Sequence, residues 1–471
     1  MTDEVILRVR NLKQHFKTGV GKYRIYNKAV DGVSFDIRRG EVFSLVGESG
    51  CGKTTTGRTI IKIYKPTDGE VYLLGRRIVA GTLGLHQEKK ALGKNLKADI
   101  KEVQQNENLS EAEKATKIAE LKENKKVRAK EINAEIKQRK IDQKEKYRPD
   151  IEEVKKVKAE NLIKVQEIKT EIENLNQEFL RFKAQAFKET DGLSVAVSEE
   201  EKKKIHDKEL ALYRKKRKEK NDTIEKLEND IVSLSIEHKF VNRPLLNKMQ
   251  MIFQDPIDSL NPRMSVKDII AESLYINGIR NDKVVLEKVY EVLKLVGLQP
   301  DHADHYPHEF SGGQRQRIGV ARAIISEPQL IIADEPISAL DVSIQAQVIN
   351  LLNDLREQLG LTILFIAHDL SVVKFLSDRL AIMYYGKIVE IGSKDAIFNN
   401  PFHPYTLSLI SSIPMPDPEY ERARGENKRY DPRVHDYSVD KPTMREIEPD
   451  HFVLANDKEF EEYKKRLKNT N

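Results

Sequence analysis

Short apolar runs alternate with polar segments in two parts of the chain, residues 1–83 and 248–414. The first part contains four β-prone runs bounded by polar or glycine residues: residues 5–9, 29–37, 41–46 and 69–74. In the second part, apolar runs at residues 330–333 and 361–367 alternate with stretches of helical periodicity. Apolar runs of this length between turn signals are typical of strands buried in a sheet. The pattern therefore predicts an α/β fold built from both parts of the chain.

A different pattern fills residues 84–247, which are rich in Lys, Glu, Asn and Gln and contain almost no Gly or Pro. One stretch has apolar positions that step by three and four residues, the spacing of a coiled-coil seam: Val165, Ile168, Ile172, Leu175, Phe179 and Phe182. Ser110 and Ser198 each precede a glutamate by three residues, which is a helix-starting capping box. We predict three long helices and a shorter one near residues 90–105, packed as an antiparallel coiled-coil bundle or hairpin.

Composition narrows the range of functions. The 471 residues include 81 basic and 75 acidic side chains, and the net charge of +6 predicts interleaved ion pairs without a dedicated nucleic-acid surface. The single cysteine, Cys51, excludes an internal disulfide framework and any cysteine-rich metal site, and it favours a reducing, cytoplasmic location. The start of the chain lacks a basic segment followed by an apolar one, so we expect no secretory signal. No apolar run approaches the ~18–20 residues of a spanning helix, so we expect any membrane role to be peripheral.

A glycine-rich phosphate-binding motif follows the apolar strand at residues 42–46 and precedes a predicted helix at residues 54–63. Its residues are Gly47, Glu48, Ser49, Gly50, Cys51, Gly52, Lys53, Thr54 and Thr55. In this P-loop pattern the glycines let backbone N–H groups face the phosphates of ATP. Lys53 then reaches the β- and γ-phosphates, and the Thr54 hydroxyl binds Mg²⁺. The motif predicts ATP and Mg²⁺ as cofactors, and we expect a bulky reagent on Cys51 to block ATP binding.

Three more strand ends carry polar residues that suit nucleotide hydrolysis. The strand at residues 330–333 leads into Asp334, which would hold Mg²⁺ through water, and Glu335, which would polarise the attacking water. Gln254 and His368 end two other predicted strands, and at the carboxyl edge of a parallel sheet both would face the γ-phosphate. Gln254 or His368 alone is more often structural, and for Asp334 and Glu335 alone a structural role is as good an explanation as a functional one, so the prediction depends on their occurring together.

A fourth feature is the turn of Ser311, Gly312, Gly313 and Gln314, which opens a predicted helix at residues 315–325. Its backbone amides and the positive end of the helix would form an anion site. A simple helix cap is the alternative explanation, and the turn alone does not decide between the two.

The order of these motifs resembles that of the ABC ATPase family: the P-loop, Gln254, the Ser311–Gln314 turn, Asp334–Glu335, Ser338–Asp341 and His368. The resemblance implies a P-loop nucleotide-binding domain with a mixed sheet core and a helical signature subdomain at about residues 256–325. It implies that the Ser311–Gln314 turn binds ATP held on a partner subunit, with Asp341 at the dimer seam. Gln254 would contact the Mg²⁺ and link the γ-phosphate to transmembrane partners. The aromatic residue that stacks on adenine in the family has three candidates here: Phe16 first, then Tyr23 and Tyr26.

Five segments match the ATPases of oligopeptide/dipeptide importers more closely: residues 253–256, 259–264, 306–310, 341–347 and 403–406. Two of them favour the F subunit of such importers over the D subunit. The resemblance covers residues 5–83 and 248–414 and, more loosely, a polar tail at residues 415–471, which lacks the cysteines of an iron–sulfur cluster. It implies an ATPase that powers peptide uptake from the cytoplasmic face of the membrane. The implied partners are a D-type ATPase subunit, two permease subunits and, indirectly, an extracellular substrate-binding protein.

The insert at residues 84–247 lies outside this resemblance. It enters the amino end of the strand at residues 249–253, and Gln254 follows the other end, which places the insert root roughly 15–20 Å from the phosphates and leaves the ATP site open. A solvated spacer and a docking arm for an unknown protein are both open as its role, and lipid or nucleic-acid binding is a lesser alternative. The rival function is an ABC ATPase of chromosome maintenance or repair, although there the coiled coil follows the glutamine strand instead of preceding it.

Overall fold

Two β-sheets form the body of the computed structural model, which describes residues 4–19, 25–105, 110–144, 151–191, 198–241, 245–255, 259–413 and 430–470. The larger sheet has the strand order β11-β12-β10-β9-β3-β8-β7-β6. The bounds of these strands are β3 (Val42–Val46), β6 (Met249–Ile252), β7 (Leu330–Asp334), β8 (Thr362–Ala367), β9 (Arg379–Tyr384), β10 (Lys387–Ser393), β11 (Thr443–Glu448) and β12 (His451–Ala455). Strands β6, β7, β8, β3 and β9 run parallel, and β10, β12 and β11 extend the sheet with antiparallel pairing. The predicted α/β fold with a mixed sheet is confirmed.

The smaller sheet is antiparallel, in the order β2-β1-β4-β5. Its strands are β1 (Val5–Thr18), β2 (Ile25–Arg38), β4 (Asp68–Leu73) and β5 (Arg76–Ala80). Strands β1 and β2 are longer than the predicted runs at residues 5–9 and 29–37. The sequence pattern misses their paired ends beside Thr18 and Ile25 because these ends lie in solvent and carry no apolar alternation. The buried side chains of this sheet share one core with β3 and with helix α1 (Lys53–Ile60).

Helices cover the other face of the larger sheet and share a second core with it. The helices of the body that follow α1 are α7 (Val266–Ile276), α8 (Asp282–Leu295), α9 (Gly312–Ile324), α10 (Val342–Leu359), α11 (Leu370–Leu376), α12 (Lys394–Asn399), α13 (Pro404–Ser411) and α15 (Asp457–Thr470). Short 3-10 turns are η1 (Leu245–Lys248), η2 (Pro300–Asp304), η3 (Pro307–Glu309) and η4 (Pro432–Val434). Every residue of β7 and β8 is buried, as expected for parallel strands with both faces covered. The first residues of the predicted helical subdomain, 256–258, lie outside the described residues.

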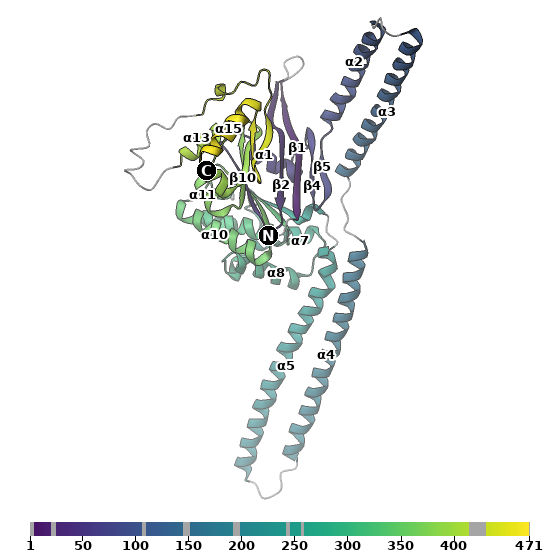
Figure 1. Cartoon of the computed structure of the whole chain (residues 1–471). Coiled ribbons are helices and arrows are strands. Elements are labelled where there is room, and N and C mark those ends of the chain that lie inside the picture. The colour runs from purple at the N-terminus through teal and green to yellow at the C-terminus, as the bar shows by residue number, and fades with distance from the viewer. Residues whose placement is uncertain are drawn as a thin grey trace, which may run out of the picture.

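The insert forms two helical hairpins, α2 with α3 and α4 with α5, which leave the body in different directions (Figure 1). The helices are α2 (Leu83–Gln105), α3 (Glu111–Lys144), α4 (Ile151–Asp191) and α5 (Glu199–Val241). The prediction of a single bundle is therefore wrong, whereas the hairpin alternative holds for each pair. The hairpins separate because α2 continues from β5 in the smaller sheet, whereas α5 leads through η1 into β6 in the larger one. Within the described ranges, no helix has both the length and the apolar character needed to cross a membrane.

Ion pairs fasten α3 to the edge of the smaller sheet. Arg77, on β5, lies 2.7 Å from Glu135 and 2.6 Å from Asp142 of α3. Arg139 of α3 donates a hydrogen bond to the carbonyl oxygen of Gly81 at 2.7 Å. The first hairpin is thus held on the body by side chains of both α3 and β5.

The α4–α5 hairpin is held by the periodic seam that the sequence predicts. The seam positions of α4 are half-buried: Val165, Ile168, Ile172, Leu175, Phe179 and Phe182. Phe179 contacts Tyr213 of α5 with ring centroids 5.5 Å apart, and the buried Asn161 donates to the carbonyl oxygen of Leu234 at 3.0 Å. The three- and four-residue spacing therefore marks the face of α4 that packs on its partner.

The end of the chain is folded onto the larger sheet. Strand β12 pairs with β10 through Val453 opposite Glu390, and β11 pairs with β12. Tyr463 of α15 packs with Phe402 and Val453 in a small third core. The sequence predicts a polar tail from residue 415, whereas residues 430–470 supply two strands and a helix. Residues 415–429 lie outside the described residues.

Candidate nucleotide site

The P-loop joins β3 to α1 and is shaped by glycines in tight contact with neighbouring backbone. A Cβ atom on Gly47 would lie 2.1 Å from the carbonyl oxygen of Met383, and one on Gly52 would lie 2.1 Å from that of Ala29. Gly52 also has φ of 109°, in the left-handed region that favours glycine. Only glycine fits these two positions, so the loop curls closely against β9 and β2 before α1 begins at Lys53.

The Lys53 side chain lies inside this curl and is only 3% exposed. Its Nζ atom donates hydrogen bonds to the carbonyl oxygens of Gly47 at 2.7 Å and Glu48 at 3.0 Å. The neighbouring Cys51 is 6% exposed, and burial raises the pKa of its thiol. The thiol is therefore shielded and protonated, and the expectation that a bulky reagent on Cys51 blocks ATP binding stays a prediction.

A buried carboxylate meets the first turn of α1. The Thr54 hydroxyl donates to Asp334 Oδ1 at 2.7 Å, and Arg58 Nη2 lies 3.6 Å from Asp334 Oδ2. Asp334 is fully buried, and this burial raises the pKa of its carboxyl group. Asp334 Oδ2 has no hydrogen-bond partner among the described residues. A hydroxyl and a carboxylate with an unused oxygen form the oxygen-rich donor set that suits Mg²⁺.

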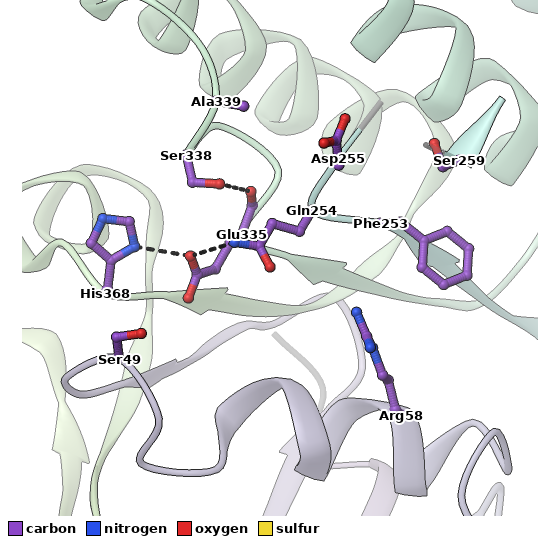
Figure 2. Close-up of a pocket in the computed structure, with 10 residues that line it drawn as sticks. All are labelled: Ser49, Arg58, Phe253, Gln254, Asp255, Ser259, Glu335, Ser338, Ala339 and His368. Atoms are coloured by element: carbon purple, nitrogen blue, oxygen red, sulfur yellow. Dashed lines mark hydrogen bonds and ion pairs between the residues drawn. The ribbon is translucent and has the colours of Figure 1, made fainter. Parts of the chain in front are cut away.

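Three predicted residues surround the carboxylate of Glu335, and Figure 2 shows two of them, Gln254 and His368. Glu335 Oε2 accepts a hydrogen bond from Gln254 Nε2 at 3.3 Å and lies 3.0 Å from His368 Nδ1. Lys53 Nζ lies 3.8 Å from the other oxygen, Oε1. Glu335 has φ of 45°, and its backbone is fixed by a bond from its N–H to the carbonyl oxygen of Ile366 at 2.9 Å. The left-handed backbone turns the side chain of Glu335 away from β7 and into the site.

These residues border an open cleft of about 900 Å³. The cleft is lined by Ser49, Arg58, Phe253, Gln254, Asp255, Ser259, Glu335, Ser338, Ala339 and His368. Arg58, which rises from α1 toward the cleft in Figure 2, is not among the residues predicted from the sequence. Its position one helical turn after Thr54 is a signal that could have found it, because residues four apart share a helix face.

The Ser311–Gln314 turn is not part of the lining of this cleft. Ser311 Oγ accepts from the N–H of Gln314 at 3.3 Å, and Gln314 Oε1 accepts from the N–H of Ser311 at 3.0 Å, so the two side chains cap α9. Ser311 and Gly312 are exposed. Asp341, the N-cap residue of α10, is also exposed and makes no side-chain capping bond. The turn therefore caps a helix and also presents its backbone to solvent.

Two of the adenine candidates, Phe16 and Tyr26, are not in the described lining of the cleft. Phe16, near the end of β1, is half-buried and packs edge-on against Tyr64 with ring centroids 5.3 Å apart. Tyr26 is exposed and has Lys17 Nζ 5.8 Å from its ring centroid. Tyr23 lies outside the described residues. The role of Phe16 in stacking on adenine stays a prediction.

Comparison with known families decides what kind of protein carries this site. The model of the ABC transporter family matches residues 30–235 and 210–338, more than half of the chain. The chain belongs to the ABC transporter family. It is an ABC ATPase, as its motif order predicted, and a second family model, the oligopeptide/dipeptide transporter C-terminal region, matches residues 389–438.

This ABC ATPase matches several relatives over most of the length of each relative. The oligopeptide transport ATP-binding protein OppF of Bacillus subtilis is 38% identical over 463 residues, which cover 98% of this chain and 99% of that protein. OppF of Streptococcus mutans is 49% identical over 311 residues, covering 63% and 97%. The dipeptide transport ATP-binding protein DppF of Lactococcus lactis is 55% identical over 224 residues, covering 47% and 71%. The predicted resemblance to oligopeptide/dipeptide importer ATPases is confirmed, and the chromosome-maintenance alternative finds no support.

Proposed function

We propose that this ABC ATPase hydrolyses ATP to power the import of oligopeptides. It would lie peripherally on the cytoplasmic face of the membrane, pair with a D-type ATPase subunit and act on two permease subunits that receive peptide from an extracellular binding protein. The carrying observation is the carboxylate of Glu335 held between Gln254, His368 and Lys53 in a chain whose relatives are named as oligopeptide transport ATP-binding proteins. Residues 1–83 with 248–414 would form the nucleotide-binding domain, and residues 84–247 an accessory insert that docks an unknown protein or acts as a spacer.

The nucleotide chemistry would follow from groups already in position. The P-loop from Gly47 to Thr55 would surround the phosphates with its backbone, and Lys53 would exchange its carbonyl partners for the β- and γ-phosphates. Mg²⁺, held by Thr54 and Asp334 with Gln254 as a further ligand, would neutralise phosphate charge.

Glu335 would act on the attacking water. Its Oε2 is engaged by Gln254 and His368, so the carboxylate is held in one orientation at the edge of the cleft. A carboxylate in this position can accept a hydrogen bond from water and draw its oxygen toward the γ-phosphorus. His368 would hold Glu335 in place and contact the γ-phosphate.

A second subunit would complete the site. The exposed Ser311–Gln314 turn offers backbone amides at the start of α9 but does not border its own cleft, which supports binding to ATP on the partner's P-loop. Asp341, exposed at the start of α10, would lie in the seam between the two subunits.

Reconstitution tests this proposal. The chain would be co-expressed with a D-type ATPase subunit and two permeases of an oligopeptide importer, placed in liposomes and assayed for uptake of a labelled peptide. We expect uptake that needs Mg-ATP and is lost in Lys53→Ala, with a wild-type complex kept at 4 °C as a control for passive binding. Hydrolysis that DNA stimulates, without assembly on the permeases, would contradict a role in transport.

A further inference from the structure

The P-loop is held from outside by a residue of the C-terminal region. The backbone N–H of Glu48 donates a hydrogen bond to the hydroxyl of Tyr405 at 3.1 Å, across 357 positions of sequence. Tyr405, in the first turn of α13, is 1% exposed. Burial raises the pKa of this hydroxyl, so it remains protonated. Its oxygen accepts the hydrogen bond from the Glu48 N–H. The segment of α13 belongs to the region that matches the oligopeptide/dipeptide transporter C-terminal model.

The same peptide of the P-loop is held from its inner side. The carbonyl oxygen of Gly47, which belongs to the same peptide as the Glu48 N–H, accepts from Lys53 Nζ at 2.7 Å, while the N–H faces Tyr405. Farther along the loop, the carbonyl oxygen of Cys51 accepts from the N–H of Gly386 at 2.9 Å. The loop is therefore fixed at its start by Tyr405 and near its end by the β9–β10 turn.

Buried hydrogen bonds fix the position of Tyr405 in turn. The N–H of Tyr405 donates to His403 Nδ1 at 3.1 Å, so this nitrogen carries no proton. Burial lowers the pKa of His403 to about 3, which is consistent with a neutral ring. The Tyr405 ring packs on Tyr384 with centroids 4.4 Å apart. The hydroxyl therefore has little freedom to move away from Glu48.

One carboxylate connects this helix start to the end of the chain. Glu390 of β10 is fully buried and accepts from the N–H groups of Phe402 at 2.8 Å and His403 at 3.1 Å. His451 Nε2 of β12 lies 2.9 Å from the same carboxylate. A continuous path of hydrogen bonds thus runs from β12 through Glu390 and α13 to the P-loop.

We propose that Tyr405 is a positioning residue of the nucleotide site, through which the C-terminal region holds the P-loop ready for phosphate. This inference rests on the proposed ATP chemistry of the P-loop. Without the hydroxyl, the Glu48 N–H would face a buried ring that offers no acceptor, and the loop would turn this N–H toward water in part of the population. The phosphates of ATP would then bind only the molecules whose loop keeps its present form, so the apparent affinity for ATP would fall in proportion to the fraction of such molecules.

Tyr405→Phe tests the proposal because it removes one oxygen and keeps the ring. Tyr430→Phe is the matched control: Tyr430 lies in the same aromatic cluster, 5.4 Å from the Tyr405 ring, and among the described residues its hydroxyl makes no hydrogen bond to the P-loop. We expect Tyr405→Phe to raise the Kd of a fluorescent ATP analogue and the KM for ATP about five-fold, the effect of one ordinary hydrogen bond. The kcat at saturating ATP should stay within about two-fold of wild type, because the groups around Glu335 are untouched.

Unchanged Kd in Tyr405→Phe, or an equal loss in Tyr430→Phe, would overturn the positioning role. A wild-type protein that neither binds nor hydrolyses ATP would instead contradict the proposed function. A measurement on the wild type alone tests the proposal even if the variant misfolds. In the nucleotide-free protein, amide hydrogen exchange should find the Glu48 N–H protected, and an unprotected amide would refute the hydrogen bond on which the proposal depends.

Discussion

Replacing Glu335 with glutamine removes one charge and one proton acceptor while preserving the shape of the side chain. In the structure, Oε2 contacts Gln254 at 3.3 Å and His368 at 3.0 Å, and Oε1 lies 3.8 Å from Lys53 Nζ. The amide oxygen of glutamine can keep a contact to one of these donors. The substitution therefore tests the chemistry of the carboxylate more than the architecture of the cleft.

Two effects of opposite sign follow from these distances. Loss of a positioned general base lowers kcat by roughly 10²–10⁴-fold. At 3.8 Å and an effective dielectric constant near 20, the Lys53–Glu335 attraction is about 4 kcal/mol, and desolvation of the two charges offsets most of it. Removing this attraction frees Lys53 for the phosphates. We therefore expect ATP to bind Glu335→Gln at least as tightly as wild type, by a margin of about 1 kcal/mol or less.

The assay has two readings, phosphate release at saturating Mg-ATP and the elution volume of the complex with its partner ATPase. We expect release to fall to background and the ATP-bound pair to persist on the column. Glu357→Gln, an exposed change on α10, should match wild type in both readings. Hydrolysis retained within ten-fold would remove Glu335 from its proposed role, whatever the state of the dimer.

The remaining predictions concern burial and the insert. Asp334→Asn should abolish Mg-ATP hydrolysis yet raise the Tm of the nucleotide-free protein by roughly 2 °C at pH 8 and by less at pH 5. Burial raises the pKa of Asp334, so the stability that the protonated carboxyl group contributes is lost as pH rises through this raised pKa, and asparagine avoids that loss. Thermal scans at both pH values check the sign, and an equal shift at the two would contradict it. Cys51 should react slowly with a bulky maleimide at pH 7 and faster at pH 9, as mass spectrometry would reveal, whereas rapid labelling at pH 7 would show that the thiol is accessible. Replacing residues 168–227 with a short linker should leave basal hydrolysis within about two-fold, because the base of the hairpin, where Val232 of α5 packs against the body, is kept. Loss of folding would refute this view of the hairpin.

Much of the nucleotide site could be predicted from sequence because its residues sit at the ends of short apolar runs. Parallel strands buried on both faces leave a clear apolar signal, and their carboxyl ends meet at one edge. This is why Glu335, Gln254 and His368, from three distant segments, were expected together and are found in hydrogen-bonding distance. The catalytic roles assigned to them remain predictions.

Contacts that join remote segments left no such signal. Tyr405 reaches Glu48 across 357 positions, because β9 pairs both with β3, which leads into the P-loop, and with β10, which precedes α13. The C-terminal strands are difficult to predict from the sequence for a related reason. In β11 no residue is fully buried, so the apolar alternation that identifies a half-buried strand is weak.

The hairpins show how a large insert can coexist with a demanding active site. The insert leaves the body from β5 and returns through η1 to β6, each of which is the outermost strand at one edge of its sheet, so no ladder between other strands is interrupted. The return point lies at the amino end of β6, whereas Gln254 follows the carboxyl end. The four residues of β6 span about 13 Å, and three of them are buried. Along the chain, a force on the α4–α5 hairpin therefore reaches Gln254 through a strand that is fixed by its pairing with β7, and this pairing limits how far the hairpin can move the side chains that surround Glu335.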